Sequence, residues 1–251
     1  MEELCPDALL LNYTNPESRI IMAISKLTKL RSVGLCHGVM GARDGVSRIL
    51  ERPLNELDIV AGGLNHFFWV MGISDAKTGE DLYPALRKRI LEDPNCPAAP
   101  PLVKKMVEVF GCYTYPSDDH IGEYLSFASE FTGLVWHYGA EARAVPREAP
   151  KPAPARWEEY ASGAKPMDER VTSRSGELAV PIILDIELDR GEWRPAVNVP
   201  NTGRYVENLP DDAVVEVAAV VERDGVHPQP IGLLPAALAA FCQRQVSIQK
   251  L

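Results

Sequence analysis

Residues 8–18 read ALLLNYTNPES, a short unbroken apolar run followed by an Asn-Pro pair. An apolar run of this length fits a strand that is buried on both faces of a parallel sheet. Asn15-Pro16 is typical of a helix start, with Asn at the N-cap and Pro in the first turn, and the expected helix runs to about Leu30. The stretch therefore predicts a strand that passes directly into a helix.

The same rhythm continues along the next part of the chain. A second apolar stretch at 33–35 ends at Cys36 before a helical pattern, and a third at 59–64 ends just before Asn65-His66. Alternating strands and helices predict a parallel α/β sheet, in which ligands bind beyond the carboxyl ends of the strands. Asn15, Cys36 and His66 all lie at such ends, which is the first functional indication.

The second half of the chain predicts a mixture of helices and strands. The expected elements are a helix at 102–110, a helix that Ser117 caps and that reaches Phe131, an extended connection at 145–154, a helix at 177–188, a strand at 214–221 and a helix at 233–245. The sequence contains no G-x-G-x-x-G and no G-x-x-x-x-G-K motif. We therefore expect that none of these residues forms a Gly-rich loop able to hold a dinucleotide or a triphosphate.

Composition excludes several classes of partner. A formal net charge of −9 argues against nucleic acid, because phosphate recognition needs clustered Lys and Arg, and it favours a small-molecule partner. No stretch approaches the roughly 20 apolar residues that a membrane span needs, and the start carries acidic residues instead of a basic leader. Five cysteines at irregular spacing make a poor disulfide framework and suit a reducing compartment. We expect a cytoplasmic protein.

Cys36 and His66 offer a thiolate and an imidazole to a divalent metal, but each candidate side chain also has an ordinary structural explanation. Buried cysteines usually just pack, and a strand-end histidine is more often an ordinary hydrogen-bonding group. Asn15 fits simple capping, and Tyr124 fits a core tyrosine with a satisfied hydroxyl. Taken one at a time, these residues favour the structural explanation.

The joint pattern changes this balance. The sequence contains, in order, NYTNP at 12–16, GLCHGV at 34–39, GLNH at 63–66, DHIGEYL at 119–125, NVPNTG at 198–203, NLPDDAVVEV at 208–217 and VHPQPIGLLP at 226–235. Together these segments closely resemble glycoside hydrolase family 4, and the resemblance spans nearly the whole chain. Several ordered motifs are far more specific than any one of them.

The resemblance implies a mixed α/β fold in which a Rossmann-like domain precedes a carboxyl-terminal domain similar to that of lactate and malate dehydrogenases. We expect residues 1–66 to be the tail end of a truncated dinucleotide-binding domain. Residues 67–251 are expected to be the catalytic carboxyl-terminal domain, truncated at its end. The fragment alone is expected to be inactive, and a full-length protein to be a homo-oligomer.

The chemistry that the resemblance implies is hydrolysis of an α-glycoside by redox-assisted elimination and addition, with NAD and Mn²⁺, which departs from the usual two-carboxylate scheme. The implied roles are metal ligation by Cys36 and His66, proton removal at sugar carbon 2 by Tyr124, protonation of the leaving group by His37, orientation of base or substrate by Asp119 and His120, and contact with sugar hydroxyls by Asn15. Because a thiolate is softer than Mn²⁺ usually prefers, Fe, Co or Ni could substitute.

The sugar preference that the resemblance implies depends on one small residue, Gly38, which follows Cys36-His37. Cys-His-Gly-Val at 36–39 resembles the uronic-acid-specific members, so an α-glucuronidase or α-galacturonidase is the first expectation and an α-galactosidase or α-glucosidase follows closely.

Two functions outside the family stay open as alternatives. A 2-hydroxy-acid dehydrogenase shares the scaffold but needs no thiolate-bound metal, and a non-catalytic remnant would serve as a binding or assembly module.

Overall fold

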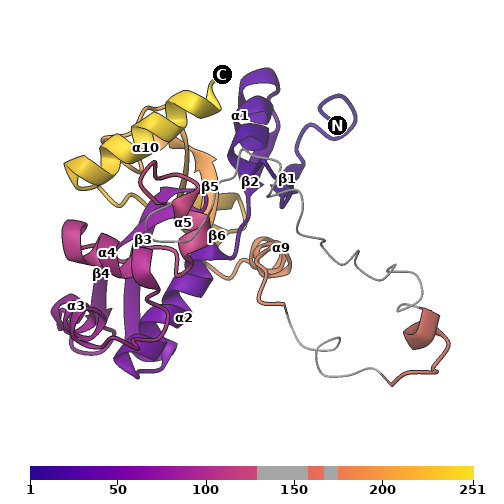
Figure 1. The fold of residues 1–251 in the computed structure, drawn as a ribbon. Coiled ribbons are helices and arrows are strands. Elements are labelled where there is room, and N and C mark those ends of the chain that lie inside the picture. Colours follow the sequence, from indigo (N-terminus) through magenta and orange to yellow (C-terminus); the bar gives the residue numbers. More distant parts are fainter. Residues whose placement is uncertain (129–157, 167–174) are drawn as a thin grey trace, which may run out of the picture.

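The computed structural model describes residues 1–128, 158–166 and 175–251, and its amino-terminal part contains two strand–helix units (Figure 1). These are β1 (Leu9–Asn12), α1 (Glu17–Leu27), β2 (Arg31–Gly34) and α2 (Gly38–Leu50). β1 and β2 are parallel, with Leu9 opposite Arg31 and Asn12 opposite Gly34. The first two predicted strand–helix units are therefore confirmed.

The third predicted strand breaks the alternation. β3 (Leu57–Leu64) is followed by β4 (Phe67–Asp75), and the two form an antiparallel hairpin whose turn consists of Asn65 and His66. The expectation of a parallel strand here was wrong, because the aromatic run Phe67-Phe68-Trp69 is itself a strand that is buried on both faces. His66 consequently lies in a hairpin turn.

The remaining strands join both halves of the described chain in one sheet. Its strand order is β1-β2-β5-β6-β3-β4, with β7 paired to β6. The other elements are α3 (Tyr83–Glu92), α4 (Pro101–Phe110), α5 (Asp118–Gly122), α9 (Ala179–Leu188), β5 (Glu192–Pro200), β6 (Val214–Glu222), β7 (Gly225–Pro228) and α10 (Ala236–Gln249), with short 3-10 turns at Leu54–Glu56 and Asn201–Gly203. β5 pairs antiparallel to β2 where Asn198 lies opposite Gly34. The parallel pair thus continues directly into the antiparallel part.

Two helix starts differ from the sequence expectation. Pro16, not Asn15, occupies the N-cap position of α1, and the Asn15 side-chain oxygen accepts a hydrogen bond from the Glu17 backbone N–H at 3.3 Å. α10 begins at Ala236 and runs to Gln249, a few residues later than expected. Both helices nevertheless lie side by side, since the Arg19 guanidinium donates to the carbonyl of Ile248 at 3.1 Å (Figure 1).

The helix expected from Ser117 to Phe131 is much shorter in the structure. α5 ends at Gly122, so Tyr124 follows the helix instead of lying on its face. Asp118 faces another helix, and its carboxylate accepts hydrogen bonds of 3.1 Å from the first backbone N–H groups of α4. Phe131 and the connection expected at 145–154 lie outside the described residues.

A main apolar core joins the sheet to most of its helices, and a second, small cluster of Ile21, Met22 and Val214 lies between α1 and β6. The main core extends from Val33 in β2 to Val246 in α10, and β6 is buried along almost its whole length. No helix within the described ranges combines the length and the apolar character needed to cross a membrane. The ends of β1 and β2 and the β3–β4 turn border one cavity at the head of this sheet.

Candidate active site

A cavity of about 390 Å³ collects most of the predicted site residues. Its lining includes Asn15, Cys36, His37, His66 and His120. A neighbouring cavity of about 440 Å³ shares Asn15, His66 and His120 with it and adds Tyr124. The structure therefore places six of the seven predicted residues around two adjoining hollows.

Asp119 is the exception. Its side chain is exposed at the start of α5, and it lines neither of the two cavities. Its neighbour His120 faces the cavities because the Ser117 hydroxyl lies 3.1 Å from the His120 Nδ1 atom. The structure therefore does not bring Asp119 together with the other six predicted residues.

Cys36 and His66 are positioned to share one metal ion. The Cys36 Sγ and His66 Nε2 atoms are 3.2 Å apart. Donors bound at about 2.3 Å (sulfur) and 2.1 Å (nitrogen) lie about 3.1 Å apart when they meet at a right angle at the ion. Burial lowers the pKa of His66, with smaller contributions from His120 and His37, and so favours the neutral imidazole that binds metals.

The thiol of Cys36 needs a positive charge nearby to act as a ligand. Its pKa is raised to about 11, chiefly by burial and also by the carboxylates of Glu216 and Glu17, while hydrogen bonds from the Gly38 backbone and Asn65 oppose the rise. A thiolate at neutral pH therefore requires a cation beside it, as metal binding provides. The donor pair and its surroundings fit a divalent ion.

Tyr115 is a site residue that the sequence motifs did not indicate. Its ring stacks on His120 with centroids 4.4 Å apart and an interplanar angle of 5°, and it meets the edge of His66 at 5.8 Å. A side chain at Gly38 would lie 2.7 Å from this ring. A side chain at position 38 would thus force the Tyr115 ring to shift, so the packing of Tyr115 favours glycine after Cys36-His37.

Glu177 is the second site residue that was missed. Its carboxylate lies 3.3 Å from the His37 Nδ1 atom. The segment is attached to β1 because the backbone N–H of Ala179 donates to the Tyr13 hydroxyl at 2.9 Å. This contact crosses more than 160 residues of sequence, which no local pattern could reveal.

Tyr124 has the geometry of a buried aromatic with one polar end. Its ring stacks on Phe67 with centroids 4.9 Å apart. Burial raises its pKa to about 12, and the carboxylates of Glu123 and Glu216 add to the effect. A phenol in this environment acts as a base near neutral pH only if a cation offsets these effects.

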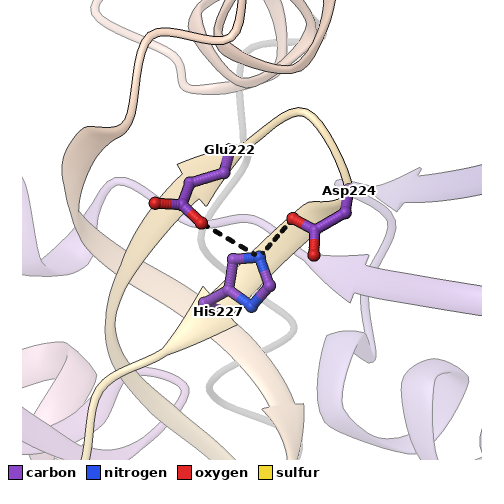
Figure 2. A group of neighbouring side chains, drawn as sticks. All are labelled: Glu222, Asp224 and His227. Carbon is purple, nitrogen blue, oxygen red and sulfur yellow. Dashed lines mark hydrogen bonds and ion pairs between the residues drawn. The ribbon is translucent and has the colours of Figure 1, made fainter.

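A second group of metal-ligating side chains lies on the β6–β7 hairpin (Figure 2). The His227 Nε2 atom is 2.7 Å from the Asp224 carboxylate and 3.8 Å from that of Glu222. All three side chains are largely exposed to solvent. Both contacts converge on the same imidazole nitrogen, so ordinary surface ion pairing accounts for the arrangement.

Comparison with known proteins identifies relatives along the whole chain. The model of the family 4 glycosyl hydrolases matches residues 1–52, and that of the family 4 glycosyl hydrolase C-terminal domain matches residues 61–251. An α-galactosidase from Bacillus subtilis is 30% identical over 99% of the chain and 57% of its own length. An α-galacturonidase from Lachnoclostridium phytofermentans is 26% identical over 94% of the chain and 55% of its own length.

A solved structure is similar over the same extent. The crystal structure of a 6-phospho-α-glucosidase from gut microorganisms, in complex with NAD and Mn²⁺, is 25% identical and superimposes with a TM-score of 0.73 over 99% of the chain and 59% of the glucosidase. The chain thus spans little more than half the length of the relatives it matches. Because the C-terminal family model covers most of its residues, the chain belongs to glycosyl hydrolase family 4.

Proposed function

We propose that this chain forms the metal- and sugar-binding part of a glycosidase that hydrolyses α-glycosides with NAD and Mn²⁺. The observation that carries the proposal is the Cys36–His66 pair, whose sulfur and nitrogen atoms lie 3.2 Å apart in a cavity at the head of the sheet. The relatives support it, since they include α-glycosidases and a 6-phospho-α-glucosidase complexed with NAD and Mn²⁺. Residues 1–66 would then be the tail end of the nucleotide-binding domain and residues 67–251 the catalytic domain.

The side chains of the site supply the acid–base functions. When bound, NAD accepts and returns a hydride, while the divalent cation stabilises negative charge on the sugar oxygens. Cys36 and His66 hold the cation. His37, held by Glu177, donates a proton to the leaving oxygen. Asn15 and His120 contact sugar hydroxyls at the mouth shared by both cavities.

Two tyrosines compete for the role of base at sugar carbon 2. Tyr124, which the sequence motif favours, lines the second cavity only. Tyr115 lines the first cavity together with Cys36, and burial raises the pKa of its phenol as it does for Tyr124. We retain Tyr124 as the proposed base, with Asp119 acting on it or on the substrate only through His120.

The sugar that we propose first is a neutral α-galactoside or α-glucoside. The uronic-acid expectation depended on Gly38, but packing against Tyr115 explains that glycine without reference to substrate. Among the described residues that line the first cavity there is no Lys or Arg to pair with a substrate carboxylate. An α-galacturonide is the second candidate because Arg19 lines the second cavity.

The metal proposal is tested by titrating the 251-residue chain with Mn²⁺ and following free Mn²⁺ by electron paramagnetic resonance. Cys36→Ala and His66→Ala should each abolish tight binding, whereas Cys5→Ala, which removes an exposed thiol, should bind like the parent. Unchanged Mn²⁺ affinity in Cys36→Ala would refute the proposed metal site.

The substrate proposal is tested with the protein that joins this chain to a nucleotide-binding domain, supplied with NAD and Mn²⁺. Nitrophenyl α-galactoside or α-glucoside should be cleaved faster than the α-galacturonide. If the galacturonide is preferred and Arg19→Gln selectively abolishes its cleavage, the second candidate is correct. The isolated chain should cleave none of them.

A further inference from the structure

Two carboxyl groups lie buried beneath the Cys36–His66 pair. Glu17, the first residue of α1, lines both cavities although only 3% of its surface is exposed. One carboxylate oxygen accepts a bond from the Ser18 hydroxyl at 3.2 Å, while the other, Oε1, has no hydrogen-bond partner. An unpartnered oxygen at this depth is costly unless something that binds there satisfies it.

The backbone makes room for this carboxylate. A Cβ placed on Gly34 would lie 1.3 Å from the Glu17 Oε1 atom, so the carboxylate rests directly on the α-carbon of residue 34. Gly34 is the last residue of β2 and stands two positions before Cys36. Because residue 34 has no side chain, the carboxylate of Glu17 can reach the first cavity from α1.

Glu216 extends the acidic group across the sheet. It is fully buried on β6, opposite Asn198 of β5, and Asn198 in turn lies opposite Gly34. The Asn198 amide donates to one Glu216 oxygen at 3.4 Å, and the second Glu216 oxygen is unpartnered. Two carboxyl groups and the Cys36 thiol thus interact electrostatically in one buried region.

The two carboxyl groups have no cationic partner among the described residues, because Arg19, which lines the second cavity with Glu17, donates to the carbonyl of Ile248 instead. Within the described ranges, no Lys or Arg forms an ion pair or hydrogen bond with Glu17 or Glu216, and none lines the first cavity. Buried carboxylates normally have a charged partner or a metal. A divalent cation held by Cys36 and His66 would supply that partner.

We propose that Glu17 is a positioning residue of the metal site, whose carboxylate helps to retain the divalent cation that Cys36 and His66 bind. The inference rests on the proposed metal-binding function. Direct ligation by Glu17 is not implied. Among the described residues, the only group with three ligand atoms within 4.8 Å of one another is Glu222, Asp224 and His227, so Glu17 does not complete such a group with Cys36 and His66. Glu17 therefore acts as a nearby negative charge and not as a ligand.

The test is titration of the 251-residue chain with Co²⁺, whose thiolate absorption band reports on Cys36. All variants carry His227→Ala, which leaves the Glu222–Asp224–His227 group without its imidazole and so keeps the titration specific to Cys36 and His66. Glu17→Gln should weaken Co²⁺ binding by about tenfold to a hundredfold, the usual effect of losing a partner beyond the ligands. The thiolate band should persist at saturating Co²⁺, since the ligands are unchanged.

Two further variants separate charge from packing. Glu17→Asp keeps the carboxylate and should retain more affinity than Glu17→Gln. Glu123→Gln removes an exposed carboxylate from the rim of the second cavity and should bind Co²⁺ like the parent. A general effect of net charge would weaken Glu123→Gln as much as Glu17→Gln and would overturn the proposal.

The outcomes also separate this inference from the proposed function. If Cys36→Ala loses Co²⁺ binding while Glu17→Gln, verified as folded by circular dichroism, keeps the parent affinity, only the role of Glu17 is refuted. If Cys36→Ala itself binds Co²⁺ like the parent, the proposed metal site falls and the role of Glu17 falls with it.

Discussion

At the scale of one residue, the buried carboxyl group of Glu17 suits the proposed metal site but lowers the stability of the fold when it is ionised. Its carboxyl group is buried beside Glu216 with one oxygen unpartnered, and burial raises its pKa from 4.5 to about 7. The folded protein therefore holds a proton on this group at pH values where the unfolded chain has released it. In the absence of metal, the ionised form should cost folding free energy.

This gives a pH prediction with a definite sign. Stability contributed by a raised carboxyl pKa is present below about pH 4.5 and is lost as the pH rises to about 7, a change of about 3 kcal/mol. Urea unfolding with chelator should thus show the parent losing stability relative to Glu17→Gln across this interval. A stability difference that does not vary with pH would contradict the raised pKa of Glu17.

The site could be predicted from the sequence only where its residues lie in recognisable motifs. Cys36 and His66 stand out because a thiol and an imidazole end two apolar runs. Glu17 resembles an ordinary acidic residue in the first turn of a helix, where it would favour the helix dipole. The Glu17 side chain can point into the cavity only because Gly34, on another element, has no side chain there. Tyr115 and Glu177 also line the cavity, and contacts with residues distant in sequence place them there.

At the scale of elements, α9 is fixed by a buried ion pair. Arg194 of β5 donates to the Asp185 carboxylate of α9 through its Nε at 2.6 Å, and the Asp185 side chain is fully buried. Several apolar side chains on the other side of α9 are exposed. The ion pair is therefore a main attachment of the helix that follows Glu177.

Asp185→Ala should destabilise the protein by about 3–5 kcal/mol, because it leaves the Arg194 guanidinium without its partner in a largely buried position. Asp189→Ala, at the end of the same helix, removes an exposed ion pair with Arg223 and a hydrogen bond from the Arg223 backbone N–H, and should cost less, about 1–2 kcal/mol. Chemical denaturation of both variants measures the difference. Equal losses would mean that Asp185 does not anchor α9.

Elements with a strong local pattern were predicted well, and those that depend on distant partners were not. Short apolar runs and helical periodicity suffice for β1, α1, β2 and α2, although the expected Asn15 cap of α1 is not formed. The hairpin partner of β3 was missed because the aromatic run that forms β4 was not recognised as a strand, and its other neighbour, β6, could not be foreseen because it begins about 150 residues later. β5 contains Pro195, which argues against a strand, and a bulge between Arg194 and Val197 accommodates it.

At the scale of the whole molecule, the sheet links segments that belong to two family models. β1 and β2 lie within the segment matched by one model, while β4, β5 and β6 lie within the other. The predicted domain boundary after residue 66 falls inside the turn of the β3–β4 hairpin. One apolar core spans both sides of it.

We therefore expect the described chain to unfold in one cooperative transition. Near- and far-ultraviolet circular dichroism should give the same urea midpoint, as expected when one core is lost at once. Deleting residues 1–66 removes β1, β2 and β3 from the sheet and should leave a product without a cooperative transition. Two separate midpoints in the intact chain would instead support two independent units.

The backbone of His66 carries a consequence for how this protein can change over generations. Its φ of 62° lies in the left-handed region, where a histidine costs about 1 kcal/mol relative to glycine. Selection for robustness alone would favour His66→Gly, because an Asn-Gly turn would make the hairpin easier to form. If His66 binds the proposed metal, glycine at this position would mark descendants that have lost that site, even though their hairpin would be more stable.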